Sequence, residues 1–173
     1  DPDVVVLLYV VNDPFPDLAI SHFLPGKLKF QHLIYNGLRI AAWRLFDPAI
    51  DPFGGQLTRL YETPRAWDEV VLAGFDRIRS FAAARELPVV VAVFPLFLEY
   101  PLPEYLALYP RVVAAAQQRG FIALDLADAA FREQPYASLV KPSRDLIHPN
   151  AHAHELAAGA IARALLHEHP ELV

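Results

Sequence analysis

Three short segments of this chain are apolar on both faces, the pattern of strands inside a parallel sheet. Residues 4–11 (VVVLLYVV) and 89–94 (VVVAVF) contain no charged side chain and are rich in β-branched residues. A half-exposed strand alternates apolar and polar positions, whereas a strand covered on both faces does not. Residues 121–124 (FIAL) form a shorter segment of the same kind. The sequence therefore predicts three buried strands.

Helical patterns lie between and after these strands. The first is predicted to start with Thr63 as its cap and Pro64 at its first position, and Pro88 prevents its continuation. Its core face is predicted to consist of Val71, Phe75, Ile78 and Phe81. Further helices are predicted over residues 110–119, ending at Gly120, over 126–133 and over 149–167. Alternating strands and helices predict an α/β doubly wound domain spanning residues 1–173.

The stretch from residue 14 to residue 66 is the irregular part of the chain, and it is too long for a bare loop in a compact domain. Residues 26–46 within it have an amphipathic pattern with Phe30, Ile34 and Leu38 on one side. We interpret it as a helical insertion packed on its own domain. The alternative is a lid over the site, or a surface that touches a membrane through its basic residues.

Composition narrows the function classes. The chain has 173 residues, 54% of them apolar, and a net charge of −5 without any basic block, which argues against nucleic-acid binding. It contains no cysteine, which excludes disulfides and thiolate metal ligands. It also contains no methionine, so we expect that these residues are part of a longer polypeptide.

The strongest signal for chemistry is the run DLIHPNAHAH over residues 145–154. Pro149 suits the first position of a helix, which would place His148 at the mouth of the last helix. From three residues earlier, the Asp145 carboxylate could accept a hydrogen bond from Nδ1–H of His148. This bond would fix the tautomer and leave Nε2 free to take a proton, as a general base must. A helix-capping Asp with an incidental His fits the pair equally well.

A second signal is the Asn12-Asp13 pair, which follows the first predicted strand directly. Ligands of open α/β sheets bind at the carboxyl ends of the strands, where an Asn amide could donate to an oxyanion. A simple turn that ends a strand also explains this dipeptide. The two signals together carry more weight, because both would lie on the same rim of one sheet.

At this point the chain resembles the SGNH or GDSL-type serine hydrolases. Residues 10–13 (VVND) look like the third block of that family, Gly-x-Asn-Asp, and residues 145–150 look like its fifth block, which supplies the Asp and His. The resemblance covers nearly the whole chain outside residues 14–66. It implies a three-layer α/β/α fold with a flavodoxin-like parallel sheet whose first strands are missing. It also implies Asp145 and His148 as catalytic residues, Asn12 as an oxyanion donor and no cofactor.

The activity that this resemblance implies is ester hydrolysis by an esterase, lipase or carbohydrate O-acetylesterase, on a small-molecule, carbohydrate or lipid ester. The chain departs from the family at Val10, where the third block has Gly, and at Ala153, where a Gly often precedes the second His. The block with the nucleophilic serine would precede Asp1. None of Ser21, Ser80, Ser138 and Ser143 is assigned as the nucleophile.

Two consequences are expected from the missing block. These 173 residues alone should hydrolyse p-nitrophenyl acetate no faster than their His148→Ala variant. The strand over residues 4–11 should be an apolar edge that needs the missing N-terminal segment or a partner chain to cover it. Two rival functions remain open: a zinc site built from His148, His152, His154 and Asp145, and a non-catalytic binding or scaffold domain of the same fold.

Overall fold

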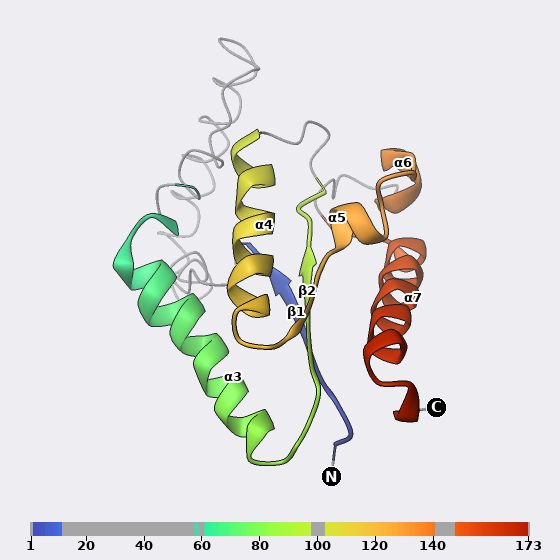
Figure 1. Ribbon diagram of the computed structural model, residues 1–173. Helices are drawn as coiled ribbons and strands as arrows, with labels where there is room; N and C mark the ends of the chain where they lie inside the picture. The colour runs from blue at the N-terminus through green and yellow to red at the C-terminus, as the bar shows by residue number, and fades with distance from the viewer. Residues whose placement is uncertain (1, 12–57, 59–60, 98–102, 141–147, 173) are drawn as a thin grey trace, which may run out of the picture.

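The computed structural model describes residues 2–11, 58, 61–97, 103–140 and 148–172 (Figure 1). Three strands, β1 (Val5–Val10), β2 (Val89–Phe94) and β3 (Ile122–Asp125), pair in parallel in the order β1-β2-β3. Val5 is paired with Val89, and Val90 with Ile122. The three predicted strands and the α/β class are therefore confirmed. The predicted helix over 26–46 lies outside the described residues.

Helices follow each strand and cover both faces of the sheet. Their bounds are η2 (Arg65–Leu72, π-helical), α3 (Ala73–Ala83), α4 (Pro103–Gln117), α5 (Leu126–Ala129), α6 (Tyr136–Leu139), α7 (Ala151–Glu168) and the 3₁₀ turn η3 (Pro170–Leu172). One core cluster joins η2, α3 and α4 to one face of the sheet, and a second joins α5 and α7 to the other face. None of the described helices has the length and apolar character needed to cross a membrane.

The helix before β2 differs from its prediction at both ends. Thr63 Oγ1 accepts a hydrogen bond from Ala66 N–H, as a cap does, but the first turns are π-helical. Phe75 is buried as expected, whereas Phe81 is 46% exposed. Ala82 lies seven residues, or about two helical turns, after Phe75, so Ala82 faces the core on the same side of the helix and Phe81 is turned away from it. Phe81 lies under the guanidinium of Arg85.

The helix before β3 begins earlier than predicted. Helix α4 starts at Pro103 and contains Pro110, which was predicted to be its first residue. A proline inside a helix removes one backbone hydrogen bond, and here the packing of α4 on the sheet outweighs that loss. Gly120, with a φ of +78°, follows the end of the helix as predicted. Helix α5 is only one turn long: it ends at Ala129, whereas the sequence predicted a helix to residue 133.

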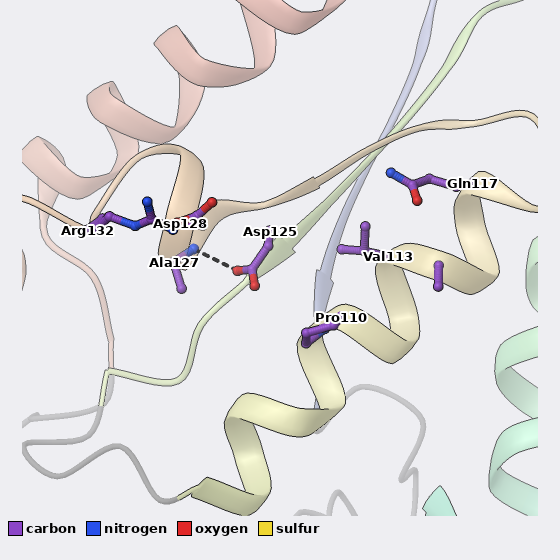
Figure 2. Close-up of a pocket in the computed structure, with 8 residues that line it drawn as sticks. Pro110, Val113, Gln117, Asp125, Ala127, Asp128 and Arg132 are labelled. Atoms are coloured by element: carbon purple, nitrogen blue, oxygen red, sulfur yellow. Dashed lines mark hydrogen bonds and ion pairs between the residues drawn. The ribbon is translucent and has the colours of Figure 1, made fainter.

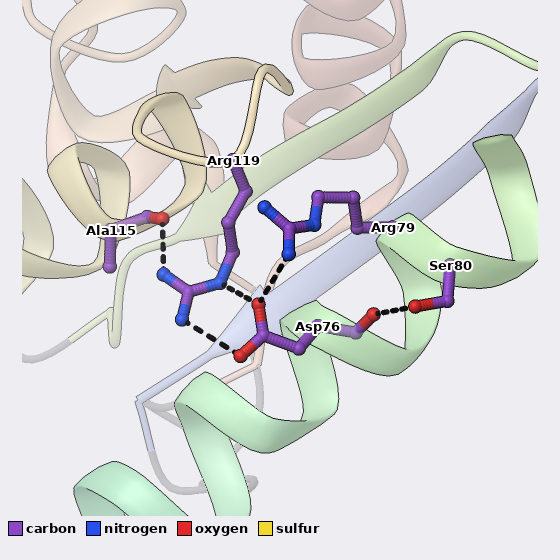
Figure 3. A network of polar contacts seen from close by, with 5 residues as sticks. All are labelled: Asp76, Arg79, Ser80, Ala115 and Arg119. Atoms are coloured by element: carbon purple, nitrogen blue, oxygen red, sulfur yellow. Dashed lines mark hydrogen bonds and ion pairs between the residues drawn. The ribbon is translucent and has the colours of Figure 1, made fainter.

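An ion pair joins the two helices that cover one face of the sheet. Arg119, which follows α4, donates to both carboxylate oxygens of Asp76 on α3, at 2.8 and 3.2 Å (Figure 3). It also donates to the Ala115 carbonyl oxygen at 3.0 Å. The hydrogen bonds from the guanidinium lower the pKa of the Asp76 carboxyl. Arg119 lies three residues before β3, so this contact joins α3 and α4 near the amino ends of the strands.

One face of β1 is not covered by any described helix. Val6 and Leu8 are 45% and 49% exposed, while their register partners on β2, Val90 and Ala92, are fully buried. All four side chains point to the face that carries α7, because alternate residues of a strand share a face. Helix α7 therefore covers β2 and leaves the same face of the neighbouring edge strand open.

Candidate active site

Of the three residues predicted to form the site, the structure describes one. His148 is exposed and lies just before α7. Asp145 and Asn12 lie outside the described residues, so the predicted Asp145–His148 hydrogen bond stays a prediction. Val11, the residue before Asn12, is fully buried at the carboxyl end of β1.

Helix α7 begins at Ala151, so the prediction that Pro149 is its first residue is wrong. Asn150 is the cap: its Oδ1 accepts a hydrogen bond from Ala153 N–H at 3.0 Å. Its Nδ2 donates to the carbonyl oxygens of Ser138 at 2.8 Å and Val140 at 3.1 Å. These bonds to a distant segment fix the cap one residue beyond the proline, so the helix starts at Ala151.

His148 is consequently attached to a well-anchored backbone. Pro149 forms an isolated antiparallel bridge with Val140, and Asn150 N–H donates to the Leu139 carbonyl oxygen at 2.8 Å. His148 is the residue directly before this bridge, so its imidazole extends from an anchored part of the backbone. Sequence reasoning singled out His148 but missed Asn150 as its anchor, although an Asn before an apolar helical run is a known cap signal.

The other two histidines of the run point to different partners. The ring of His154 lies against Phe94, the last residue of β2, with ring centroids 5.7 Å apart. His152 Nδ1 lies 3.9 Å from a carboxylate oxygen of Glu155. Within the described ranges no group of three or more His, Asp or Glu side chains could hold a metal ion. The fourth member of the proposed zinc set, Asp145, lies outside these ranges.

The hydroxyl groups of the two described serines are bonded to backbone carbonyls. Ser80 donates to the Asp76 oxygen within α3, at 2.9 Å. Ser138 donates to the Pro135 oxygen at 2.7 Å, and it belongs to the segment that anchors Asn150. Neither is held in a strand-to-helix turn of the kind that presents a nucleophile. Ser21 and Ser143 lie outside the described residues.

A half-buried carboxyl also lies at this rim, at the end of β3, and the sequence reasoning did not single it out. Asp125 accepts a hydrogen bond from Ala127 N–H at 3.0 Å and faces a surface hollow of about 580 Å³ between α4 and α5 (Figure 2). Burial raises the pKa of the Asp125 carboxyl, and the hydrogen bond from Ala127 opposes this shift. An Asp between an apolar strand and a helix is the signal that could have identified it.

Tyr109 of α4 lies close enough to be influenced by this carboxyl. Its buried hydroxyl accepts a hydrogen bond from Leu96 N–H at 3.0 Å. Burial, together with the charge of Asp125, raises the pKa of Tyr109 to about 12, so the phenol is protonated at neutral pH. Phe94 and Phe97 lie near the carboxyl end of β2 and are buried against Phe131. These two rings therefore belong to the core.

Replacing Asp125 by Asn is expected to stabilise the protein at neutral pH. The folded carboxyl has a raised pKa, so the folded state binds its proton more tightly than the unfolded state. The stability that this provides is present below the ordinary pKa of 3.8 and is lost as the pH rises through the folded pKa. Asn also caps helices well, and it carries no charge to bury. The gain over wild type in urea unfolding should therefore be present at pH 7, decrease as the pH falls through the folded pKa, and be lost below 3.8.

The matched control for this prediction is Asp125→Ala, which removes both the charge and the cap. Relative to Asp125→Asn it should lose about 1 kcal/mol of unfolding free energy at every pH, since only the cap distinguishes the two variants. An Asn variant that is less stable than wild type at pH 7 would contradict the assigned cause.

The described residues form an α/β protein with a small parallel sheet. A histidine, His154, lies beside the carboxyl end of strand β2. A scan against models of protein families finds no match, and neither a search of curated proteins nor a search of solved structures finds one. The family resemblance of the third and fifth blocks therefore remains a hypothesis based on the residues of the chain itself.

Proposed function

We propose that this chain carries the acid–base part of an ester hydrolase of the SGNH type. His148 is the general base, Asp145 orients it, and Asn12 donates to the oxyanion. The observation that supports the proposal is that Phe94 lies beside both the strand that precedes Asn12 and the helix that follows His148. This residue is the register partner of Val10, and its ring contacts His154 in the first turn of α7. The end of β1 and the start of α7 thus lie at the carboxyl end of one sheet, where such sheets bind ligands.

The topology supports a site at the end of β1 in particular. Helices α3 and α4 connect β1 to β2 and β2 to β3, and both lie on one face of the sheet. The strands are added in the order β1-β2-β3, so each new strand lies farther from β1. In a doubly wound sheet a second series of strands extends in the opposite direction, and its helices lie on the other face. The open edge of β1 and the uncovered Val6 and Leu8 fit one such strand–helix unit. The end of β1 would then be the switch point of the sheet.

We therefore place the nucleophilic serine on a strand–helix unit that docks beside β1 and precedes Asp1 in the same polypeptide. A second copy of this chain fits less well. Pairing two β1 strands would satisfy the edge hydrogen bonds but would leave Val6 and Leu8 without a helix above them. A strand followed by a helix covers both the edge and the face.

The mechanism follows from these roles. His148 Nε2 takes the proton of the serine hydroxyl as its oxygen attacks the ester carbonyl carbon. The carbonyl oxygen becomes an oxyanion that accepts a hydrogen bond from the Asn12 amide. The C–O bond to the alcohol breaks, and the alcohol leaves with the proton from His148. Water then repeats the sequence on the acyl-serine, releasing the acid and regenerating the serine.

The test uses the protein extended by the residues encoded before Asp1 and a fluorophosphonate probe, which reacts with activated serines. We expect one labelled serine N-terminal to Asp1, and no labelling in the His148→Ala variant. Ser138→Ala is the matched control, because Ser138 lies beside the anchor of His148 and should be irrelevant to labelling. A folded extended protein that stays unlabelled, or labelling that maps to Ser138, would overturn the proposal. An unlabelled protein would favour the binding or scaffold domain.

A further inference from the structure

A surface hollow of about 580 Å³ lies at the carboxyl end of β3, between α4 and α5 (Figure 2). Its α4 side is mostly apolar and includes Pro110, Val113 and Ala114. Polar side chains line it from the end of β3 and from the segment around α5. Ligand pockets commonly combine an apolar wall with a few polar groups that fix the orientation of the ligand. The hollow is therefore a candidate for a binding site in addition to the proposed ester site.

The central polar group of the hollow is the half-buried carboxyl of Asp125. One of its oxygens, Oδ1, accepts the hydrogen bond from Ala127 N–H that caps α5. Within the described part of the chain, no donor bonds the other oxygen, Oδ2. An ionised carboxylate can accept about four hydrogen bonds. Asp125 therefore keeps acceptor positions for a ligand in the hollow.

The other groups around the hollow do not compensate the charge of this carboxylate. Arg132, the one cation among the residues that line it, forms an ion pair with Asp128. Gln117 is uncharged, and burial raises the pKa of Tyr109 to about 12, so this phenol is neutral at pH 7. The lining thus carries two carboxylates and one guanidinium, which leaves the negative charge of Asp125 without a counter-ion.

We propose that the hollow binds a small organic monocation, whose primary ammonium group contacts Asp125 and whose apolar body lies against α4. The ammonium group supplies the positive charge and the N–H donors for Oδ2. A divalent metal ion fits less well, because Ca²⁺ and Mg²⁺ take about six or more oxygen ligands. The described residues contain no group of three or more side chains that could hold a metal ion. The proposal does not depend on ester hydrolysis, since His148 does not line the hollow.

The carboxylate has a cost for the fold that a bound cation would offset. Burial raises the pKa of Asp125, so its charge destabilises the folded protein at neutral pH. An asparagine would cap α5 without this cost. A carboxyl whose pKa is shifted by burial and that lies in a cleft is typical of functional sites. A cation in contact with Asp125 would stabilise its charged form.

The experiment titrates benzylammonium into the ¹⁵N-labelled extended protein at pH 7 and follows the amide resonance of Ala127. Benzyl alcohol has the same ring without the charge, and benzoate has the opposite charge. We expect benzylammonium to give a saturable shift at concentrations up to about 10 mM and to bind about tenfold more tightly than benzyl alcohol, because only the cation makes a charge-assisted contact. Benzoate should give no shift.

The variant Asp125→Asn removes the charge and keeps the cap, so the fold should be retained. It should weaken the binding of benzylammonium about tenfold and change that of benzyl alcohol less than about twofold. The matched control is Glu133→Gln, which removes one negative charge from an exposed residue outside the lining. Its affinities should stay near those of the wild type, because salt screens exposed charges that do not contact the ligand.

The side-chain carboxyl ¹³C resonance of Asp125 gives a second readout. A proton and the cation compete for the same carboxylate, so saturating benzylammonium should move the titration midpoint of Asp125 to lower pH. The affinity for benzylammonium should fall as the pH falls through the raised pKa of the unliganded carboxyl. Of its neighbours, Asp128 is paired with Arg132 and Tyr109 titrates only at high pH.

Each of four results would overturn the inference. They are the absence of a saturable Ala127 shift, equal affinities for benzylammonium and benzyl alcohol, equal benzylammonium affinities of wild type and Asp125→Asn, and an Asp125 midpoint that benzylammonium does not move.

Discussion

Replacing His148 by alanine in the extended protein is expected to reduce kcat for p-nitrophenyl acetate by about 10⁴-fold or more, with little change in KM. Loss of the general base removes the proton acceptor for the serine and the proton donor for the leaving alcohol at once, and losses of this size follow from removing a triad histidine. Substrate binding does not require the imidazole, so the change should appear in kcat. The measurement is steady-state hydrolysis of the purified variant, with a circular dichroism spectrum to show that it is folded.

The other histidines of the same run supply the control. His152 is exposed and faces Glu155, so His152→Ala should retain at least about half of the wild-type kcat. A zinc site would respond differently, because His148, His152 and His154 would each be ligands and a chelator would abolish activity. Comparable losses in His148→Ala and His152→Ala, together with inactivation by EDTA, would refute the serine mechanism and favour the metal hydrolase.

The elements that could be predicted were those whose signal is local. Residues 89–94 read as a buried strand because six successive side chains are apolar, and each is buried in β2. Positions set by distant partners were predicted less well. The start of α7 depends on two carbonyls ten and twelve residues away, which accept from Asn150 and outweigh the preference of Pro149 for a first helical position.

The same distinction applies to the rim. His148 could be singled out because the residues around it form a compact motif, whereas the hydrogen bond from the Tyr61 hydroxyl to the Val11 carbonyl oxygen joins positions 50 apart that no periodicity connects. Asp125 was overlooked because its importance lies in the burial of its carboxyl at the end of β3, which depends on how α4 and α5 pack. Asn12 and Asp145 lie outside the described residues, so the oxyanion donor and the Asp145–His148 pair stay predictions.

Replacing Leu8 by lysine is expected to turn the 173-residue chain from a self-associating species into a monomer. An uncovered apolar edge strand pairs readily with other chains, and a lysine on the edge is a device that prevents such pairing. Leu8 is 49% exposed on the uncovered face of β1, so a lysine there should be tolerated by the fold. Size-exclusion chromatography with light scattering should show 19.4 kDa for the variant and a larger mass for the wild-type chain.

Val70→Lys separates the edge from general surface hydrophobicity. Val70 is 40% exposed, similar to Leu8, but it lies on η2, where there is no unpaired strand. Its replacement should leave the association unchanged. In the extended protein Leu8→Lys should also reduce fluorophosphonate labelling, because the same position is where the serine-bearing unit docks. Two results would contradict the view that β1 is an inner strand that pairs with a further strand. One is a wild-type chain that is monomeric at about 100 μM, and the other is a Val70→Lys variant that dissociates as fully as Leu8→Lys.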